Sequence, residues 1–410
     1  MKIAIWYHLP SGGAKRMLYD YVKALAGRGH NLEIWCPSTS DTRYLPLDKL
    51  APEHVIPYGG GLNAIREMDK ISRECAEEIN RSGFDLLLAC SCQLTAAPFI
   101  GRYVRIPKVL YLQEPNRRFY EARPILPWIE EGHTIQSTWF QRIFQAFKYT
   151  LRFHMMRKQA KEEWLNARSY DLILVNSYFS RENVRRVYDV DSTVCYPGID
   201  PFLFFPGLSN KEPFIVGLGA FVPHKGIDFA LESVARCSEP RPRLVWIGDQ
   251  GDRNYMRMLE HKARSLGVDL EMRFKVSDQE LVGLLGRASL LFYPPYLEPF
   301  GLAVLEANAC ETPVVAVAEG GIRETVQDGV NGFLINRNPL QAARRIEELL
   351  ANPTLIEALG RNGHRLVQEN WNLNDSIDRL EHILECVRSG YFEHHSSFTG
   401  STHSYLGENL

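Results

Sequence analysis

The chain lacks the features that mark several large classes of protein. None of its eight cysteines forms a Cys-x-x-Cys pair, and Cys90 and Cys92 are too close together for a standard zinc pair. Most cysteines fall in apolar runs, which is typical of buried thiols in a reducing, cytoplasmic setting. No apolar run approaches the roughly 20 residues that a membrane-spanning helix needs, and we expect no signal peptide before the first strand. The formal charge of −2 argues against a nucleic-acid partner.

The chain does contain a regular alternation of short apolar runs and amphipathic stretches, which predicts an α/β protein. Its 410 residues are enough for two domains, each with its own core. We expect two doubly wound, Rossmann-like parallel sheets that face each other across a cleft. Strands are predicted at 3–7, 32–36, 85–90, 108–112, 171–176 and 193–196, and then at 214–218, 243–247, 270–274, 290–293, 314–317 and 333–335.

Proline and glycine cluster between Pro197 and Gly207, which indicates an interdomain hinge. We expect the first domain over 1–200, joined by a returning helix at 373–388, and the second domain over 201–372. The tail from 389 to 410 is rich in Ser, His, Thr and Gly, and we expect it to be disordered.

The stretch 289–321 carries the clearest chemical pattern, with a predicted strand, a Pro-rich loop, a helix and a second strand. Glu298 lies in the loop, and Glu306 lies on the helix four residues after Leu302. Helical side chains lean toward the N-terminus, so Glu306 points back to the helix start near Gly301, where free N–H groups favour an anion. Both acids alone would be ordinary solvated residues, but the strand–loop–helix setting favours a binding site.

Three more loops are expected at the carboxyl edges of the sheets, where α/β proteins bind ligands. Gly12 and Gly13 follow the first strand and allow a phosphate or sugar to approach the backbone. Gln113 and Glu114 follow the strand at 108–112, and Lys225 follows the first strand of the second half. Each has a plainer alternative, namely an ordinary turn, a polar loop and a surface lysine.

The pattern changes between 117 and 168 to long helices with large apolar and basic residues. A basic, aromatic-rich amphipathic helix suits an anionic membrane surface, although such helices more often pack on their own domain. Peripheral contact with the inner membrane face through residues 139–161 therefore stays open. The stripe is Trp139, Phe140, Ile143, Phe144, Phe147 and Leu151, and the basic residues are Arg142, Lys148, Arg152, Arg157, Lys158 and Lys161.

In this order and spacing, the motifs resemble those of the family 4 glycosyltransferases, which are retaining enzymes of the GT-B fold. The resemblance covers nearly the whole chain, from Met1 to about Arg388. Its most diagnostic part runs from Glu298-Pro299-Phe300-Gly301-Leu302 through Glu306-Ala307 and is similar to the family's E-x7-E element. The other matching segments are Gly12-Gly13, Asn176-Ser177, Pro197-Gly198-Ile199-Asp200, Val222-Pro223-His224-Lys225-Gly226, Glu319-Gly320-Gly321 and Asp328-Gly329-Val330-Asn331-Gly332.

The resemblance implies transfer of a hexosyl group from a nucleotide-diphosphate sugar to a glycan or lipid-linked acceptor, as in polysaccharide or glycoconjugate synthesis. It also implies retention of the anomeric configuration, with no cofactor and no metal. Lys225 would pair with the diphosphate. The remaining donor-binding residues would be Gly12, Gly13, Phe300, Gly301, Leu302 and Glu306.

The same resemblance assigns separate roles to the acidic residues. Glu306 would hold the ribose hydroxyls, and Glu298 would hold sugar hydroxyls beside the reacting carbon. Gln113 and Glu114 would lie on the acceptor side, where Glu114 would bind or deprotonate the acceptor. The expected catalytic residues are therefore Glu298, Lys225 and Glu114.

Two departures from the family pattern bear on catalysis. Ala220 stands where many members carry an arginine partner to the lysine, and no arginine lies between 214 and 225. One phosphate contact is therefore missing or supplied from elsewhere. Gln113 stands where many members carry a histidine, and a glutamine cannot act as a base. These departures leave open a catalytically weak GT-B homologue that binds a glycan or a partner.

Two other functions have weaker support in the sequence. Asp189-Val190-Asp191 spells the acid pair of metal-dependent transferases, but it lies at a helix end or turn ahead of the hinge, so we expect no metal there. Gly217-Leu218-Gly219 is a partial dinucleotide-binding motif of an oxidoreductase, with Val222 where the last glycine belongs. No acidic residue follows the next strand in the required setting.

Overall fold

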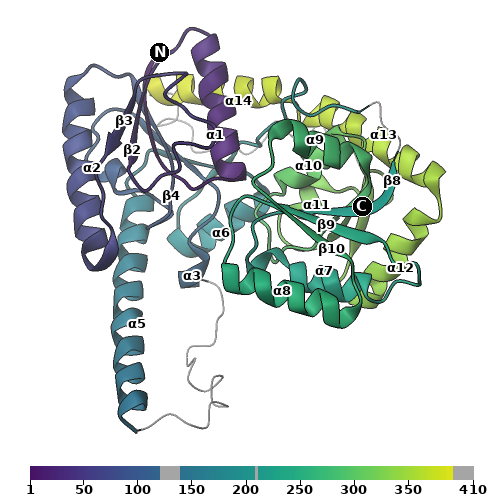
Figure 1. Cartoon of the computed structure of the whole chain (residues 1–410). Coiled ribbons are helices and arrows are strands. Elements are labelled where there is room, and N and C mark those ends of the chain that lie inside the picture. The colour runs from purple at the N-terminus through teal and green to yellow at the C-terminus, as the bar shows by residue number, and fades with distance from the viewer. Residues whose placement is uncertain (121–138, 208–210, 391–410) are drawn as a thin grey trace.

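The computed structural model of the chain describes residues 1–120, 139–207 and 211–390. Two parallel sheets lie side by side, each between layers of helices (Figure 1). Their strand orders are β3-β2-β1-β4-β5-β6-β7 and β10-β9-β8-β11-β12-β13. The first order reverses at β1 and the second at β8, each of which is the first strand of its sheet in the chain. Doubly wound sheets bind ligands at such a switch point. This topology confirms the predicted fold class.

The first sheet contains one strand that the sequence pattern did not predict. The four residues of β3 have no buried side chain, so they lack the apolar run on which the prediction depends. The elements are β1 (Lys2–His8), α1 (Gly13–Gly27), β2 (Asn31–Pro37), β3 (Glu53–Ile56), η1 (Gly61–Asn63), α2 (Ala64–Arg81), β4 (Leu86–Cys92), η2 (Phe99–Arg102), β5 (Lys108–Leu112), α3 (Arg117–Tyr120), α5 (Trp139–Ala167), β6 (Leu172–Val175), α6 (Tyr178–Tyr188) and β7 (Thr193–Val194).

The second sheet and its helices follow the predicted alternation closely. The strands β10 and β12 have the predicted bounds to the residue. The elements are β8 (Glu212–Leu218), η3 (Pro223–Lys225), α7 (Ile227–Val234), β9 (Arg243–Gly248), α8 (Arg253–Leu266), β10 (Leu270–Phe274), α9 (Asp278–Arg287), β11 (Ala288–Tyr293), α10 (Leu302–Ala309), β12 (Val314–Val317), α11 (Ile322–Thr325), β13 (Gly332–Ile335), α12 (Pro339–Leu350), α13 (Pro353–Asn370) and α14 (Leu373–Arg388).

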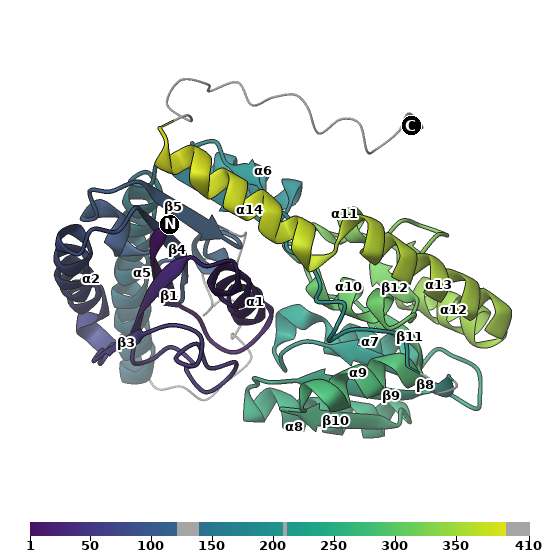
Figure 2. The same ribbon diagram turned by 90° about the horizontal axis from the view of Figure 1, so that it is seen from above.

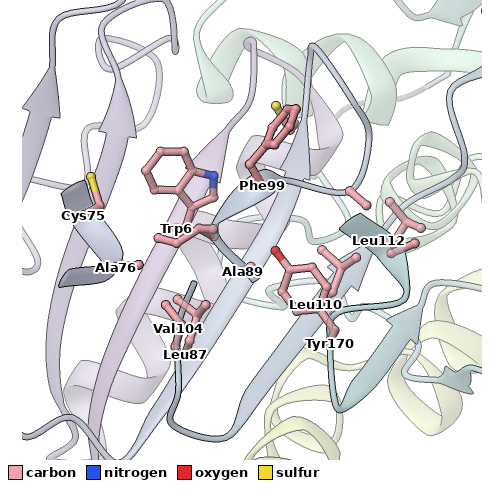
Figure 3. Close-up of a cluster of buried hydrophobic side chains, with 14 of the residues drawn as sticks. Trp6, Cys75, Ala76, Leu87, Ala89, Phe99, Val104, Leu110, Leu112 and Tyr170 are labelled. Carbon is pink, nitrogen blue, oxygen red and sulfur yellow. The ribbon is translucent and has the colours of Figure 1, made fainter. Parts of the chain in front are cut away.

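Both faces of the first sheet are buried. On one face, Trp6 and Leu87 from neighbouring strands meet Cys75 and Ala76 of α2 (Figure 3). On the other face, α1 and α14 cover the strands. Strands that are covered on both faces need apolar residues at every position, which explains their continuous apolar runs.

The last helix returns to the first domain, as the fold prediction stated. In Figure 2, α14 continues from α13 over the second sheet and crosses to α1. Ile377 and Leu380 are fully buried in the first domain's core, and the Ser376 hydroxyl lies 2.9 Å from the hydroxyl of Tyr21. The chain therefore connects the two domains twice, once between β7 and β8 and once between α13 and α14.

No helix in the described part of the chain is long and apolar enough to cross a bilayer. Residues 391–410, most of the tail that was expected to be disordered, lie outside the described residues.

Candidate active site

The loop between β11 and α10 is the centre of the site. Gly301 begins α10 with φ at +97°, a left-handed conformation that favours glycine. The turn at Gly321 packs directly on this loop, and its N–H donates to the Glu298 carbonyl at 2.8 Å. A Cβ atom on Gly321 would lie 2.1 Å from the Pro299 carbonyl oxygen. The two glycine-containing turns therefore fix the backbone that carries Glu298.

The loop after β8 brings a cation to this carboxylate. Lys225 donates from Nζ to Glu298 Oε2 at 2.8 Å, and both side chains are largely buried. The next residue, Gly226, packs against the backbone of Pro294. A Cβ atom on Gly226 would lie 2.3 Å from the Pro294 carbonyl oxygen. Lys225 is therefore held in an ion pair and is only 20% exposed, so the surface-lysine alternative does not describe it.

The loop after β5 adds a second ion pair from the first domain. Arg117 donates from Nε to Glu114 at 2.7 Å and from Nη1 to the Tyr296 carbonyl at 2.7 Å. It also donates to the carbonyl of Leu297, whose φ of +46° is unusual for a side-chain-bearing residue. Arg117 thus joins the loop after β5 to the loop that carries Glu298.

These four side chains form one charge cluster, composed of Glu114, Arg117, Lys225 and Glu298. Burial raises the pKa of Glu114 to about 7, while Arg117 opposes that rise and Glu298 adds to it. Burial also opposes ionisation of Glu298, but Lys225 and Arg117 outweigh it and lower its pKa. The cluster therefore contains one carboxylate that stays ionised and one that titrates near neutral pH.

Glu306 is a buried residue of α10, and its charged neighbours, Arg16 and Asp278, form a second cluster with it. Burial raises its pKa, Arg16 opposes the rise, and Asp278 adds to it. Arg16 reaches from α1 to Asp278 on α9, with Nη1 and Oδ2 3.2 Å apart, and also donates to the Tyr44 hydroxyl at 3.1 Å. A buried carboxylate in this setting suits neutral hydroxyl ligands such as those of a ribose.

The loop after β1, in the first domain, contacts the second domain at the start of α10 and after β9. A Cβ atom on Gly13 would lie 3.2 Å from Leu302 Cδ1, at the start of α10. The Gln250 side chain, which follows β9, donates to the Ser11 carbonyl. The Gly12-Gly13 turn thus lies against the helix start that was expected to hold an anion.

Two of the expected site residues have side chains that are engaged elsewhere. Gln113 accepts from Asn176 Nδ2 at 2.8 Å and donates from Nε2 toward the Met17 sulfur at 3.4 Å. Phe300 is buried between Tyr196 and Trp371, with ring centroids 5.8 and 5.5 Å away. The Gln113 amide therefore orders the loop after β5. The Phe300 ring belongs to the core, which leaves only the Phe300 backbone for a ligand.

Sequence profiles of two families together match most of the chain. The family described as Glycosyltransferase Family 4 matches residues 11–202, and Glycosyl transferases group 1 matches residues 200–366. The chain belongs to these glycosyltransferases. Its two parallel-sheet domains have the GT-B fold of its structural neighbours.

Individual relatives of this glycosyltransferase are distant or match only in part. The D-inositol 3-phosphate glycosyltransferase of Streptomyces bingchenggensis is 31% identical over 228 residues, which cover 49% of this chain and 50% of that enzyme. Human alpha-1,3/1,6-mannosyltransferase ALG2 is 23% identical over 406 residues, which cover 90% and 92%. Anabaena HepE, solved with UDP and glucose, has a TM-score of 0.71 at 20% identity and covers 94% of this chain and 99% of its own.

Two functional candidates in this glycosyltransferase were not singled out from the sequence. The family pattern placed the missing cation near Ala220, but the structure brings Arg117 to the cluster from the other domain. The signal for Arg117 is its position three residues after Glu114. Arg16 follows the Gly12-Gly13 turn within one helical turn, and nothing local indicates that it faces Glu306.

The acid pair discounted as a metal site has other surroundings in this glycosyltransferase. Asp189 ends α6 in a left-handed conformation, and Asp191 pairs with Arg181 at 3.1 Å. Within the described ranges, no group of three His, Cys, Asp or Glu side chains is arranged to hold a metal ion.

Proposed function

We propose that this protein transfers a hexosyl group, with retention of configuration, from a nucleotide-diphosphate sugar to a glycan or lipid-linked acceptor. The observation that carries the proposal is the junction of Lys225, Glu298 and the start of α10. One cation, one ionised carboxylate and free N–H groups lie together there, as binding of a diphosphate with an attached sugar requires.

The donor is assigned to the second domain. Lys225 and the N–H groups near Gly301 and Leu302 hold the diphosphate, and Glu306 holds the ribose hydroxyls. Glu298 is ionised and accepts hydrogen bonds from sugar hydroxyls beside the reacting carbon. A hexosyl donor is also supported by two similar proteins, since HepE was solved with UDP and glucose and the human relative is a mannosyltransferase.

Arg117 is our candidate for the second cation in place of an arginine at position 220. Its guanidinium lies within reach of Glu114 and the Tyr296 carbonyl, beside the Lys225–Glu298 pair. As the glycosidic bond breaks, charge grows on the leaving diphosphate, and preorganised cations stabilise that charge. The diphosphate itself accepts the acceptor's proton, so the reaction needs no separate strong base. The cations and the N–H groups at the start of α10 take the place of a metal in stabilising its charge.

The acceptor is assigned to the first domain, beside Glu114. Because the pKa of Glu114 is about 7, its carboxyl is partly protonated at neutral pH. It can therefore accept a hydrogen bond from a hydroxyl of the acceptor substrate or donate one to it. We place the reaction in the cytoplasm, because seven of the cysteines are buried free thiols, which suits a reducing compartment.

Nucleotide release from a panel of UDP-, GDP- and ADP-hexoses tests the proposal. We expect one donor to be hydrolysed slowly without acceptor, and Glu306→Ala to lose this activity while Glu357→Ala, an exposed acid on α13, retains it. Activity should persist in EDTA, and the product should keep the donor's anomeric configuration by NMR. Hydrolysis at the wild-type rate in Glu306→Ala would refute the residue assignment.

A catalytically weak homologue is the second candidate. The Gln113 amide, which stands where many family members carry a histidine, already bonds Asn176, so it offers the acceptor little. Nucleotide binding without hydrolysis or transfer, in a folded protein, would favour this candidate.

A further inference from the structure

The N-terminal half of α5 stands clear of the body of the protein. Between 144 and 154 every described side chain is exposed, and the apolar ones include Phe144 at 62%, Phe147 at 65% and Leu151 at 47%. The other half of the same helix is buried toward its end, where Glu163 is 0% exposed. One helix thus has an anchored half and an uncovered half.

Three of the uncovered apolar residues share one face of the helix, while Phe153, which is 54% exposed, lies on the opposite face. Phe144, Phe147 and Leu151 are spaced by three and four positions, which places them along a single stripe. Large exposed apolar side chains gathered in one stripe usually mark a surface that contacts another molecule. The Lys148 ammonium lies 5.5 Å from the centre of the Phe144 ring, so charge flanks the stripe directly.

The charge of this segment selects its partner. Residues 139–161 contain no aspartate or glutamate. A second copy of the chain would bring the same positive charge to the contact, whereas an anionic surface would complement it. The described basic side chains of the segment are Lys148, Arg152, Arg157, Lys158 and Lys161.

The C-terminal half of α5 is anchored to the first domain and fixes the direction of the exposed segment 144–154, which we call the arm. Arg102 pairs with Glu162 at 2.8 Å, and Gln159 donates to the Leu94 carbonyl. Glu163 accepts from the Tyr188 hydroxyl at 2.6 Å and from the Asn116 N–H at 3.0 Å. Asn116 belongs to the loop that carries Glu114, so the base of the arm is bonded to the acceptor side of the site.

The arm extends beyond the edge of the sheet that carries the site. Because α5 precedes β6, which is parallel to β5, it runs opposite to the strands. Its 29 residues span about 44 Å, whereas the five residues of β5 span about 17 Å. Its N-terminal half therefore projects past the carboxyl edge, on the side of α3 (Figure 1).

We propose that the stripe of Phe144, Phe147 and Leu151, with its flanking basic residues, lies in the headgroup region of an anionic lipid bilayer. The helix is an interfacial one, with aromatic rings among the acyl-chain ends and cations at lipid phosphates. Bilayer binding itself is independent of catalysis. Its consequence for a lipid-linked acceptor rests on the proposed function, because the arm holds the Glu114 loop near the membrane surface.

Co-sedimentation of the full chain with vesicles tests the proposal. We expect binding to phosphatidylcholine vesicles containing phosphatidylglycerol, weaker binding to phosphatidylcholine alone, and release by salt. Phe144→Ser/Phe147→Ser/Leu151→Ser should abolish binding, and Lys148→Gln/Arg152→Gln should lower the partition coefficient about thirtyfold. The matched controls, Phe202→Ser at an 88% exposed site and Arg185→Gln/Arg186→Gln on the exposed side of α6, should bind like wild type.

Three outcomes would overturn the proposal. They are no binding by wild type, unchanged binding by the triple variant, or a dimer in analytical ultracentrifugation that the triple variant loses while vesicles have no effect. Nucleotide binding, measured without vesicles, separates this proposal from the proposed function. It also tests whether each variant is folded. A variant that no longer binds vesicles but still binds nucleotide has lost only its contact with the bilayer.

Discussion

At the scale of single residues, Arg117 is the side chain that most distinguishes this site. It bonds Glu114 of its own loop and two carbonyls of the facing loop. We expect Arg117→Ala to lower kcat/KM about 10- to 100-fold, because charge-assisted hydrogen bonds of this kind contribute about 1.5–3 kcal/mol. Arg117→Lys should recover part of the loss, and the exposed neighbour Arg118→Ala should have little effect. Equal kinetics in Arg117→Ala and Arg118→Ala would contradict this role.

The raised pKa of Glu114 predicts a change of stability with pH. The folded chain holds this proton up to about pH 7, whereas the ordinary value is 4.5. A raised pKa stabilises the fold below pH 4.5, and that contribution is lost as the pH rises to about 7. Wild type should therefore lose stability between pH 5 and pH 7 relative to Glu114→Gln, as measured by urea unfolding. Parallel curves for the two proteins would show that Glu114 titrates normally.

The sequence predicted the parts of the site that are local in the chain. Glu298, Gly301 and Glu306 belong to one strand–loop–helix unit, so spacing alone related them. Contacts between distant residues were not accessible in this way. The Arg117–Tyr296 bond spans 179 positions and the Arg16–Asp278 pair spans 262, and both depend on how the two domains face each other.

At the scale of elements, the turn at Gly321 supports the Glu298 loop by close approach. Gly321→Ala would force its Cβ atom against the Pro299 carbonyl, at 2.1 Å, and we expect a loss of about 1–3 kcal/mol in unfolding free energy. It should also weaken donor binding. Gly283→Ala on α9 is the control, because no atom lies within 4 Å of its Cβ position. A stable Gly321→Ala protein with normal donor affinity would show that the loop does not depend on this turn.

The element predictions succeeded or failed according to burial. Strands covered on both faces have continuous apolar runs, which the sequence displays. The strand β3 has no buried side chain and was missed. For α5 the periodicity revealed the stripe, but periodicity cannot say what covers a stripe. The structure supplied that part, because the exposed fractions show that the described protein leaves it open.

At the scale of the whole molecule, the two domains meet through several contacts around the cleft. Arg16 reaches Asp278, and the Ser177 hydroxyl donates to the Pro299 carbonyl at 2.5 Å. Glu324 accepts from the first N–H groups of α6, including that of Tyr178 at 3.0 Å. These contacts hold loops of the first domain against the loop that carries Glu298, so the candidate site depends on how the two domains face each other.

We propose that the second domain binds a nucleoside diphosphate through Lys225 and Glu306. Thermal unfolding with UDP, GDP and ADP tests it most directly, because a ligand bound only by the native state adds about 2.7 kcal/mol at 100 times its Kd. We predict that at least one nucleotide raises the Tm of wild type and of Glu357→Ala. The same nucleotide should not change the Tm of Lys225→Ala or of Glu306→Ala. No shift in the Tm of wild type, or an equal shift in Glu306→Ala, would show that these residues do not bind the nucleotide as proposed.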